Sequence, residues 1–135
     1  IKGLGRALLR EKIVEIHADR FVVVVDESKV VERLGLGPMP VEILPFGLEA
    51  HLRWLETLGC RAELWHEEDG SRIVTDNGNY LVRCWFSEGI ADAYALADTL
   101  AKRPGIIEHG LFLDMATDLV VAGEAGIRAV DKSVS

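Results

Sequence analysis

The sequence predicts an α/β fold with two lobes, the second inserted into the first. Residues 1–38 contain a helical pattern, a wholly apolar strand and a short helical segment, an order typical of a parallel α/β layer. Residues 39–113 follow the order β-α-β-β-α-β, which is that of a ferredoxin-like α+β domain. Residues 114–135 return to apolar strand patterns. We therefore expect residues 1–38 and 114–135 to form part of a Rossmann-like layer, the catalytic α/β domain of the chain, with the ferredoxin-like domain at 39–113 inserted into it.

The first lobe begins with a helical pattern at residues 6–18, which contain neither glycine nor proline. Apolar side chains recur along one stripe at Leu9, Ile13 and Ile16. This periodicity predicts a helix that turns these three side chains towards the core.

A strand and a short helical segment follow. Residues 20–26 are β-branched and apolar on both faces, which is typical of a strand covered on both sides. Residues 28–34 are expected to form one or two helical turns, which end at the glycine- and proline-rich segment 35–38.

The inserted lobe alternates between the two periodicities. Its expected strands are 40–46, 61–66 and 106–113, together with strand material at 72–75 and 80–86 on either side of a turn at Asn77-Gly78, which is expected to be turn-forming rather than a site. Its expected helices are 48–58, with four leucines on one side, and 90–102, with Ile90, Tyr94, Ala97 and Ala101 facing inward. The apolar segments 118–122 and 127–130 lack a partner in this lobe, so we expect them to return to the first lobe.

The composition limits the class of partner. The formal net charge of −7 argues against nucleic acid or an anionic membrane surface as the main partner. No segment is apolar for long enough to predict a transmembrane helix. The two cysteines form neither a metal-binding spacing nor a disulfide framework, which favours a reducing, cytoplasmic setting. The four histidines are scattered, and no metal site is expected.

The opening segment Lys2-Gly3-Leu4-Gly5 runs directly into the first helix. Glycine lets the backbone approach a ligand closely, and a lysine beside a helix N-terminus favours an anion. An ordinary tight turn before a helix explains the same residues, and the motif by itself does not exclude that interpretation.

Two further residues have both a functional and an ordinary interpretation. Glu11 lies off the apolar stripe of the helix, with Glu15 beside it, and is either a solvated surface residue or a carboxylate directed into a cleft. Lys29 follows the apolar strand, where ligands of open α/β sheets gather, and is either a surface loop lysine or a ligand for a phosphate or sugar oxygen. Spacing does not choose between these interpretations.

Several segments together resemble the ribose-5-phosphate isomerase A family. They are IKGLGRALLREKIVE at 1–15, VVVDESKVVERLG at 23–35, PMPVEILPF at 38–46, VTDNGNYL at 74–81, and PGIIEHGLF and DLVVAG between 104 and 123. These segments span nearly the whole chain in the order of the family.

The resemblance implies a cofactor-free and metal-free interconversion of ribose 5-phosphate and ribulose 5-phosphate through an enediolate. Glu11 matches the general base of the family, the loop Lys2, Gly3, Leu4 and Gly5 holds the substrate, and Lys29 is a further substrate-binding lysine. The family is usually a homodimer or homotetramer. Leu4 and Arg6 depart from its glycine-rich loop, which leaves selectivity among phosphosugars open.

The resemblance also implies that an upstream part is absent. The chain begins at Ile1 without a methionine. A threonine- and serine-rich phosphate loop and an aspartate-rich loop of the family do not occur in it, so this chain alone is expected to be nearly inactive. The competing hypotheses are a ferredoxin-like module that binds a small molecule without catalysis, and a fragment that self-associates through its exposed surface.

Overall fold

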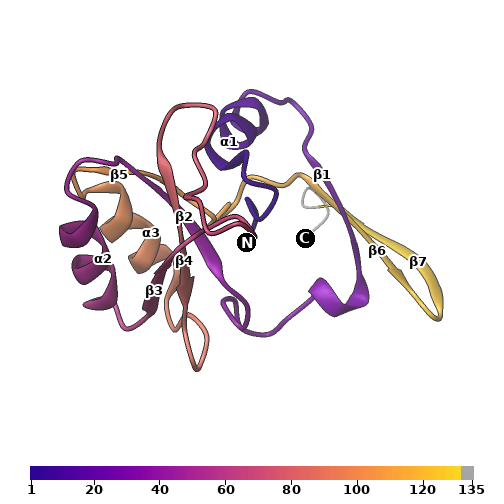
Figure 1. The fold of residues 1–135 in the computed structure, drawn as a ribbon. Coiled ribbons are helices and arrows are strands. Elements are labelled where there is room, and N and C mark those ends of the chain that lie inside the picture. The colour runs from indigo at the N-terminus through magenta and orange to yellow at the C-terminus, as the bar shows by residue number, and fades with distance from the viewer. Residues whose placement is uncertain (132–135) are drawn as a thin grey trace.

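The computed structural model describes residues 1–131, which form two sheets and three α-helices (Figure 1). The smaller sheet has the strand order β1-β6-β7 and the larger sheet the order β3-β4-β2-β5. The helical elements are α1 (Leu8–Ile16), the 3₁₀ helix η1 (Glu27–Lys29), α2 (Leu48–Glu56) and α3 (Ala93–Ala101). The strands are β1 (Val22–Asp26), β2 (Met39–Ile43), β3 (Arg61–Leu64), β4 (Tyr80–Trp85), β5 (Ile106–His109), β6 (Asp118–Gly123) and β7 (Gly126–Asp131).

The larger sheet has the ferredoxin-like order that the sequence predicts. All of its neighbouring strands pair antiparallel, and β2 and β4 occupy its centre. Helices α2 and α3 cover one face (Figure 1). The core between them is built from buried side chains that include Met39, Val41, Ile43, Leu55, Val82 and Leu100.

The smaller sheet joins the first and last parts of the chain. β6 pairs parallel with β1, from Val22 opposite Asp118 to Asp26 opposite Ala122, and β7 pairs antiparallel with β6. The expected return of the last strands is therefore confirmed. The expected cover on both faces of β1 is wrong for the described residues, because Val24 is 70% exposed. β1 lies at the edge of this sheet, with β6 as its one neighbour in the described chain.

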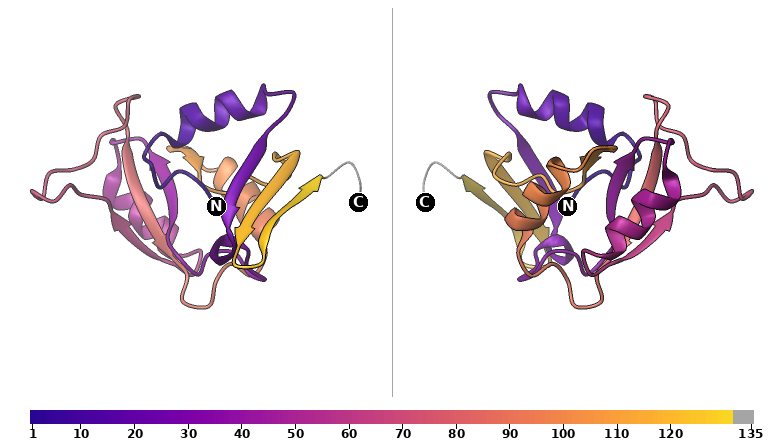
Figure 2. Two further views of the ribbon diagram at one scale, coloured as in Figure 1. Left: turned by 90° about the vertical axis from the view of Figure 1, so that its right-hand side faces the viewer. Right: turned by 90° about the vertical axis from the view of Figure 1, so that its left-hand side faces the viewer.

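Helix α1 lies across the space between the two sheets, which open away from each other (Figure 2). Its expected apolar stripe is wrong, since Ile13 is 50% and Ile16 69% exposed. The buried side chain is Leu8, which packs with Ile73 and Leu81. Helix α1 lies on the side of the larger sheet away from α2 and α3 (Figure 1). The apolar contact of the helix with this sheet is made at its first turn, and the later apolar positions turn away from the sheet.

Three smaller differences from the expectations remain: two concern element ends and one the orientation of a side chain. Of the expected helical segment 28–34, only η1 forms, beginning one residue earlier. The expected strand 72–75 forms only isolated bridges, from Arg72 to His66 and from Val74 to Tyr80. Tyr94 is exposed rather than inward, and its hydroxyl donates to Asp114 at 2.8 Å.

Within the described residues, no helix has the length and apolar character that crossing a membrane requires.

Candidate functional site

The opening loop is attached to the larger sheet by backbone hydrogen bonds. The amide of Lys2 donates to the carbonyl of Gly110 at 2.9 Å, and the amide of Gly110 donates to Pro40 at 2.8 Å. Gly3 is buried with a φ of +95°, and a Cβ there would lie 2.7 Å from Leu8 Cδ1. Glycine is therefore required at position 3 by both backbone conformation and space.

The rest of the loop forms a tight turn at the surface. The amide of Arg6 donates to the carbonyl of Gly3 at 3.0 Å, and Arg6 has a positive φ of 72°. Its guanidinium pairs with Glu67 at 2.7 Å. Leu4 is 49% exposed, and Gly5 has open space where a Cβ would lie. Position 5 therefore carries no steric need for glycine.

The ammonium group of Lys2 is the centre of the site. Its Nζ lies 2.7 Å from Glu11 Oε1 and 3.4 Å from Glu15 Oε1. The rings of Phe21 and Phe112 have their centroids 5.8 and 5.7 Å from the same atom. Burial acts against the charged form, but hydrogen bonds and charge from both glutamates outweigh it and raise the pKa of Lys2.

The two glutamates that bind Lys2 have different surroundings. The side chain of Glu11 is 32% exposed, whereas that of Glu15 is 13% exposed. Burial raises the pKa of Glu15 against the opposing effect of Lys2, and the charge of Glu11 raises it further. A partly exposed carboxylate beside an ammonium group can accept a proton from a ligand while the ammonium stabilises negative charge on a ligand oxygen.

Lys12 holds α1 on one side of Glu11. Its Nζ donates to Glu108 Oε1 at 2.6 Å and to the carbonyls of His109 and Leu111 at 2.7 and 3.0 Å. The side chain of Lys12 is 13% exposed, so these bonds are partly shielded from water. They fix α1 to the end of β5.

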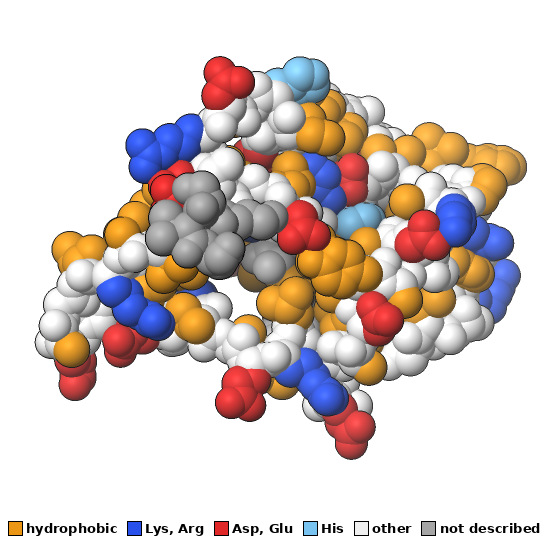
Figure 3. Space-filling model, turned by 180° about the vertical axis from the view of Figure 1, so that it is seen from behind, with side chains coloured by type: hydrophobic (Ala, Val, Ile, Leu, Met, Phe, Trp, Pro, Cys, Tyr) orange, Lys and Arg blue, Asp and Glu red, His pale blue; other side chains and the backbone are white. Residues whose placement is uncertain are grey.

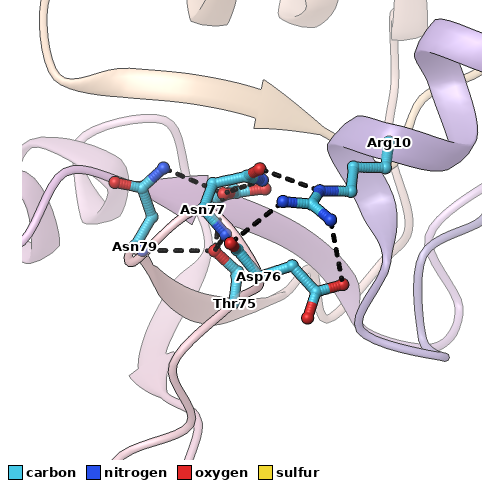
Figure 4. A network of polar contacts seen from close by, with 6 residues as sticks. Arg10, Thr75, Asp76, Asn77 and Asn79 are labelled. Carbon is cyan, nitrogen blue, oxygen red and sulfur yellow. Dashed lines mark hydrogen bonds and ion pairs between the residues drawn. The ribbon is translucent and has the colours of Figure 1, made fainter.

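Arg10 holds the other side of the helix through the turn at residues 75–79 (Figure 4). It donates to Asn77 Oδ1 at 3.1 Å and to the carbonyl of Asp76 at 3.0 Å. Arg10 and Lys12 thus attach the segment around Glu11 to two different parts of the larger lobe.

The same turn surrounds a buried carboxylate. Glu42 in β2 is 1% exposed, and its Oε1 accepts hydrogen bonds from Thr75 Oγ1 at 2.8 Å, Asn79 Nδ2 at 2.9 Å and Asn77 Nδ2 at 3.1 Å. The sequence suggested only turn-forming chemistry for this segment. The structure confirms the turn, with the amide of Gly78 donating to Thr75 O at 2.9 Å, and adds the bonds to Glu42.

Lys29 lies at the carboxyl end of β1, as the sequence predicts. Lys2, Leu4 and Lys29 line one hollow of about 780 Å³ between β1 and the segment 34–38 that leads into β2. Seen from behind, the molecule is hollowed between its two lobes (Figure 3). The hollow has apolar walls from residues 22–25 and two lysines.

The structure therefore brings the predicted residues together to different degrees. Lys2 and Glu11 are in contact, Lys29 shares the hollow with Lys2, Gly3 lies buried beneath the loop, and Gly5 lies at its exposed turn. Sequence reasoning missed the roles of Arg10, Lys12 and Glu42 and noted Glu15 only as a neighbour. The spacing of four between Glu11 and Glu15 was the one available signal for the latter. No group of His, Cys, Asp and Glu side chains within residues 1–131 has the arrangement of a metal site.

Comparison with known proteins identifies relatives of the chain. A model of the family "Ribose 5-phosphate isomerase A (phosphoriboisomerase A)" matches residues 1–126. The chain is 44% identical to a probable ribose-5-phosphate isomerase 2 of Arabidopsis thaliana, over 98% of this chain and 52% of that protein. It is 45% identical to ribose-5-phosphate isomerase A of Rhodopseudomonas palustris strain TIE-1, over 98% of this chain and 60% of that protein.

A solved D-ribose-5-phosphate isomerase in complex with phospho-erythronic acid has the same fold, with a TM-score of 0.91 and 35% identity. That match covers 98% of this chain and 58% of the solved one. The chain thus spans only about half to three-fifths of the length of the relatives that it matches.

Proposed function

The chain belongs to the ribose 5-phosphate isomerase A family, and on that premise we propose that it forms the base-bearing part of an enzyme that interconverts ribose 5-phosphate and ribulose 5-phosphate. The observation that carries the proposal is the contact of 2.7 Å between Glu11 Oε1 and Nζ of Lys2, a residue that lines the hollow. A carboxylate and an ammonium group are the two functions that an aldose–ketose isomerisation requires.

The proposed reaction moves one proton between adjacent carbons. The Glu11 carboxylate takes the proton from C2 of the aldose, and the electrons of the C–H bond form the C1–C2 double bond of an enediolate. The Lys2 ammonium stabilises the negative charge that develops on the former carbonyl oxygen. Glu11 then returns the proton to C1, a proton moves from the C2 hydroxyl to the C1 oxygen, and the ketose results.

The other predicted residues have binding roles in this proposal. The loop Lys2, Gly3, Leu4 and Gly5 contacts the sugar, and Lys29, which lines the same hollow as Lys2 and Leu4, binds a further substrate oxygen. The solved relative with phospho-erythronic acid supports a phosphorylated sugar as the ligand class. We propose that residues present in the longer relatives, including a phosphate loop, complete the site.

We further propose a cytoplasmic homodimer or homotetramer. Two free cysteines, Cys60 and Cys84, are compatible with a reducing compartment. Exposed apolar side chains on α1, β1 and the loop after β2, where Phe46 is 87% exposed, support burial of further surface in an assembly.

The test compares isomerisation of ribose 5-phosphate by this chain and by a form extended with upstream residues. We expect activity in the extended form, and a loss of about 10²- to 10⁴-fold in Glu11→Gln, the range for removal of a general base. Glu49→Gln, an equal change of charge on the exposed surface of α2, should leave the rate unchanged. Full activity in Glu11→Gln would refute the role of Glu11. An inactive extended form would favour the alternative of a small-molecule-binding or oligomerisation module without catalysis.

A further inference from the structure

Lys2 is shared by two carboxylates rather than paired with one. Glu11 and Glu15 both approach its Nζ, at 2.7 and 3.4 Å, from successive turns of α1. Only Glu11 has a role in the proposed reaction. Glu15 is the more buried of the two, and its Oε2 is enclosed and makes no hydrogen bond within the described residues.

This arrangement is unfavourable unless the cation compensates for it. Like charges four residues apart on a helix repel each other, and a buried carboxylate oxygen without a hydrogen bond has lost its hydration without replacement. Helix α1 has an exposed surface on which a glutamate would be fully hydrated, yet Glu15 faces Lys2. Because Glu15 faces Lys2, its charge attracts the Lys2 ammonium, which a glutamate on the exposed surface of α1 would not do.

We propose that Glu15 is a positioning residue that holds the Lys2 ammonium in place while Glu11 carries the substrate proton. The inference rests on the proposed isomerase function. When Glu11 takes up a proton it becomes neutral and no longer attracts Lys2. At that step the enediolate oxygen bears its negative charge, and the ammonium must remain beside it.

Among residues 1–131, Glu15 is the anionic partner that Lys2 keeps once Glu11 is neutral. The side chains that approach from outside α1 are the rings of Phe21 and Phe112, which carry no charge. Lys12, the other cation near Glu15, is bound to Glu108 and to two backbone carbonyls. Glu15 therefore interacts with Lys2, and a lysine without it would be free to turn from the hollow into water.

The first measurement follows the titration of Lys2 in this chain by NMR of its labelled side chain. Glu15→Gln keeps the shape of the side chain and removes its charge, so the pKa of Lys2 should fall relative to the unaltered chain. Glu49→Gln should leave it unchanged. An unchanged Lys2 titration in Glu15→Gln would overturn the proposal.

The second measurement uses the upstream-extended form and separates positioning from folding and binding. We expect Glu15→Gln to lower kcat roughly tenfold, because a misplaced electrostatic group acts on the transition state more than on the bound substrate. KM should change less than twofold, the urea unfolding midpoint should be kept, and Glu15→Asp should recover part of kcat. An active extended form whose Glu15→Gln variant has unaltered kcat would overturn the proposal. An inactive extended form would instead overturn the proposed function, and the positioning role of Glu15 with it.

Discussion

Replacing Glu42 with leucine removes the acceptor around which the turn at residues 75–79 is organised. Glu42 is 1% exposed, and three side chains donate to its Oε1. Two of the donors, Thr75 and Asn79, are only 8% exposed, so water does not readily replace the lost bonds. Leucine has a similar size but accepts no hydrogen bond.

The expected loss follows from the donors left without a partner. An unsatisfied buried donor costs about 1–3 kcal/mol, and two of them cost about 2–6 kcal/mol. The gain from replacing a buried carboxylate by an apolar side chain offsets part of this, so we expect Glu42→Leu to lower the free energy of unfolding by about 3 kcal/mol. Glu42→Gln keeps an acceptor and loses only the charge-assisted part of the bonds, about 1 kcal/mol.

Urea unfolding followed by circular dichroism measures both changes. With a slope of about 1–3 kcal/mol per molar urea, a loss of about 3 kcal/mol lowers the midpoint by at least about 1 M. Glu49→Gln provides the control for removing one exposed charge and should shift stability by less than about 0.5 kcal/mol. A Glu42→Leu variant with the midpoint of the unaltered chain would refute the idea that these hydrogen bonds stabilise the turn.

Two further changes test the surroundings of the loop. The pKa of His109 lies near 4 instead of 6.5, because burial and then the charge of Lys12 disfavour protonation and outweigh Glu108. The unfolded chain therefore binds a proton on His109 more tightly than the folded chain does. The contribution of His109 to the free energy of unfolding is complete above pH 6.5 and falls by roughly 3 kcal/mol as the pH approaches 4. Urea unfolding of His109→Gln should lack this component between pH 7 and pH 4.5, and equal pH dependence in both chains would contradict it. Gly3→Ala should cost about 2–3 kcal/mol in the same assay, because it combines a positive φ with a clash against Leu8, and a loss below 0.5 kcal/mol would show that the loop adapts.

The order of elements was predictable because each periodicity is local. The apolar segments at 118–122 and 127–130 lacked a partner in the second lobe, and the structure adds them to the sheet of β1, with β6 beside β1 and β7 beside β6. The buried face of α1 was not predictable from its pattern. Apolar residues occur at five of its nine positions, Leu8, Leu9, Ile13, Val14 and Ile16, so several stripes fit. Contact with the larger sheet, which the local pattern does not encode, selects Leu8.

The site was predictable only in part, for a similar reason. Lys2 and Glu11 were associated through family resemblance, since spacing left a surface glutamate equally possible. Glu42 is a charge inside an otherwise apolar strand, and its donors lie more than thirty residues away along the chain. Because these donors are so distant in sequence, nothing in the residues around Glu42 indicates that its carboxylate is buried. Lys12 likewise finds its acceptors only where α1 meets the end of β5.

The position of Glu11 depends on the second lobe more than on the helix that carries it. Helix α1 has nine residues, one buried side chain and no side-chain cap at Ala7, and a helix so short is marginal on its own. Its attachment comes from Leu8 and from Arg10 and Lys12, the two neighbours of Glu11, each bonded to a different part of the larger lobe. The larger lobe therefore fixes, from both sides, the turn of helix that holds Glu11 against Lys2.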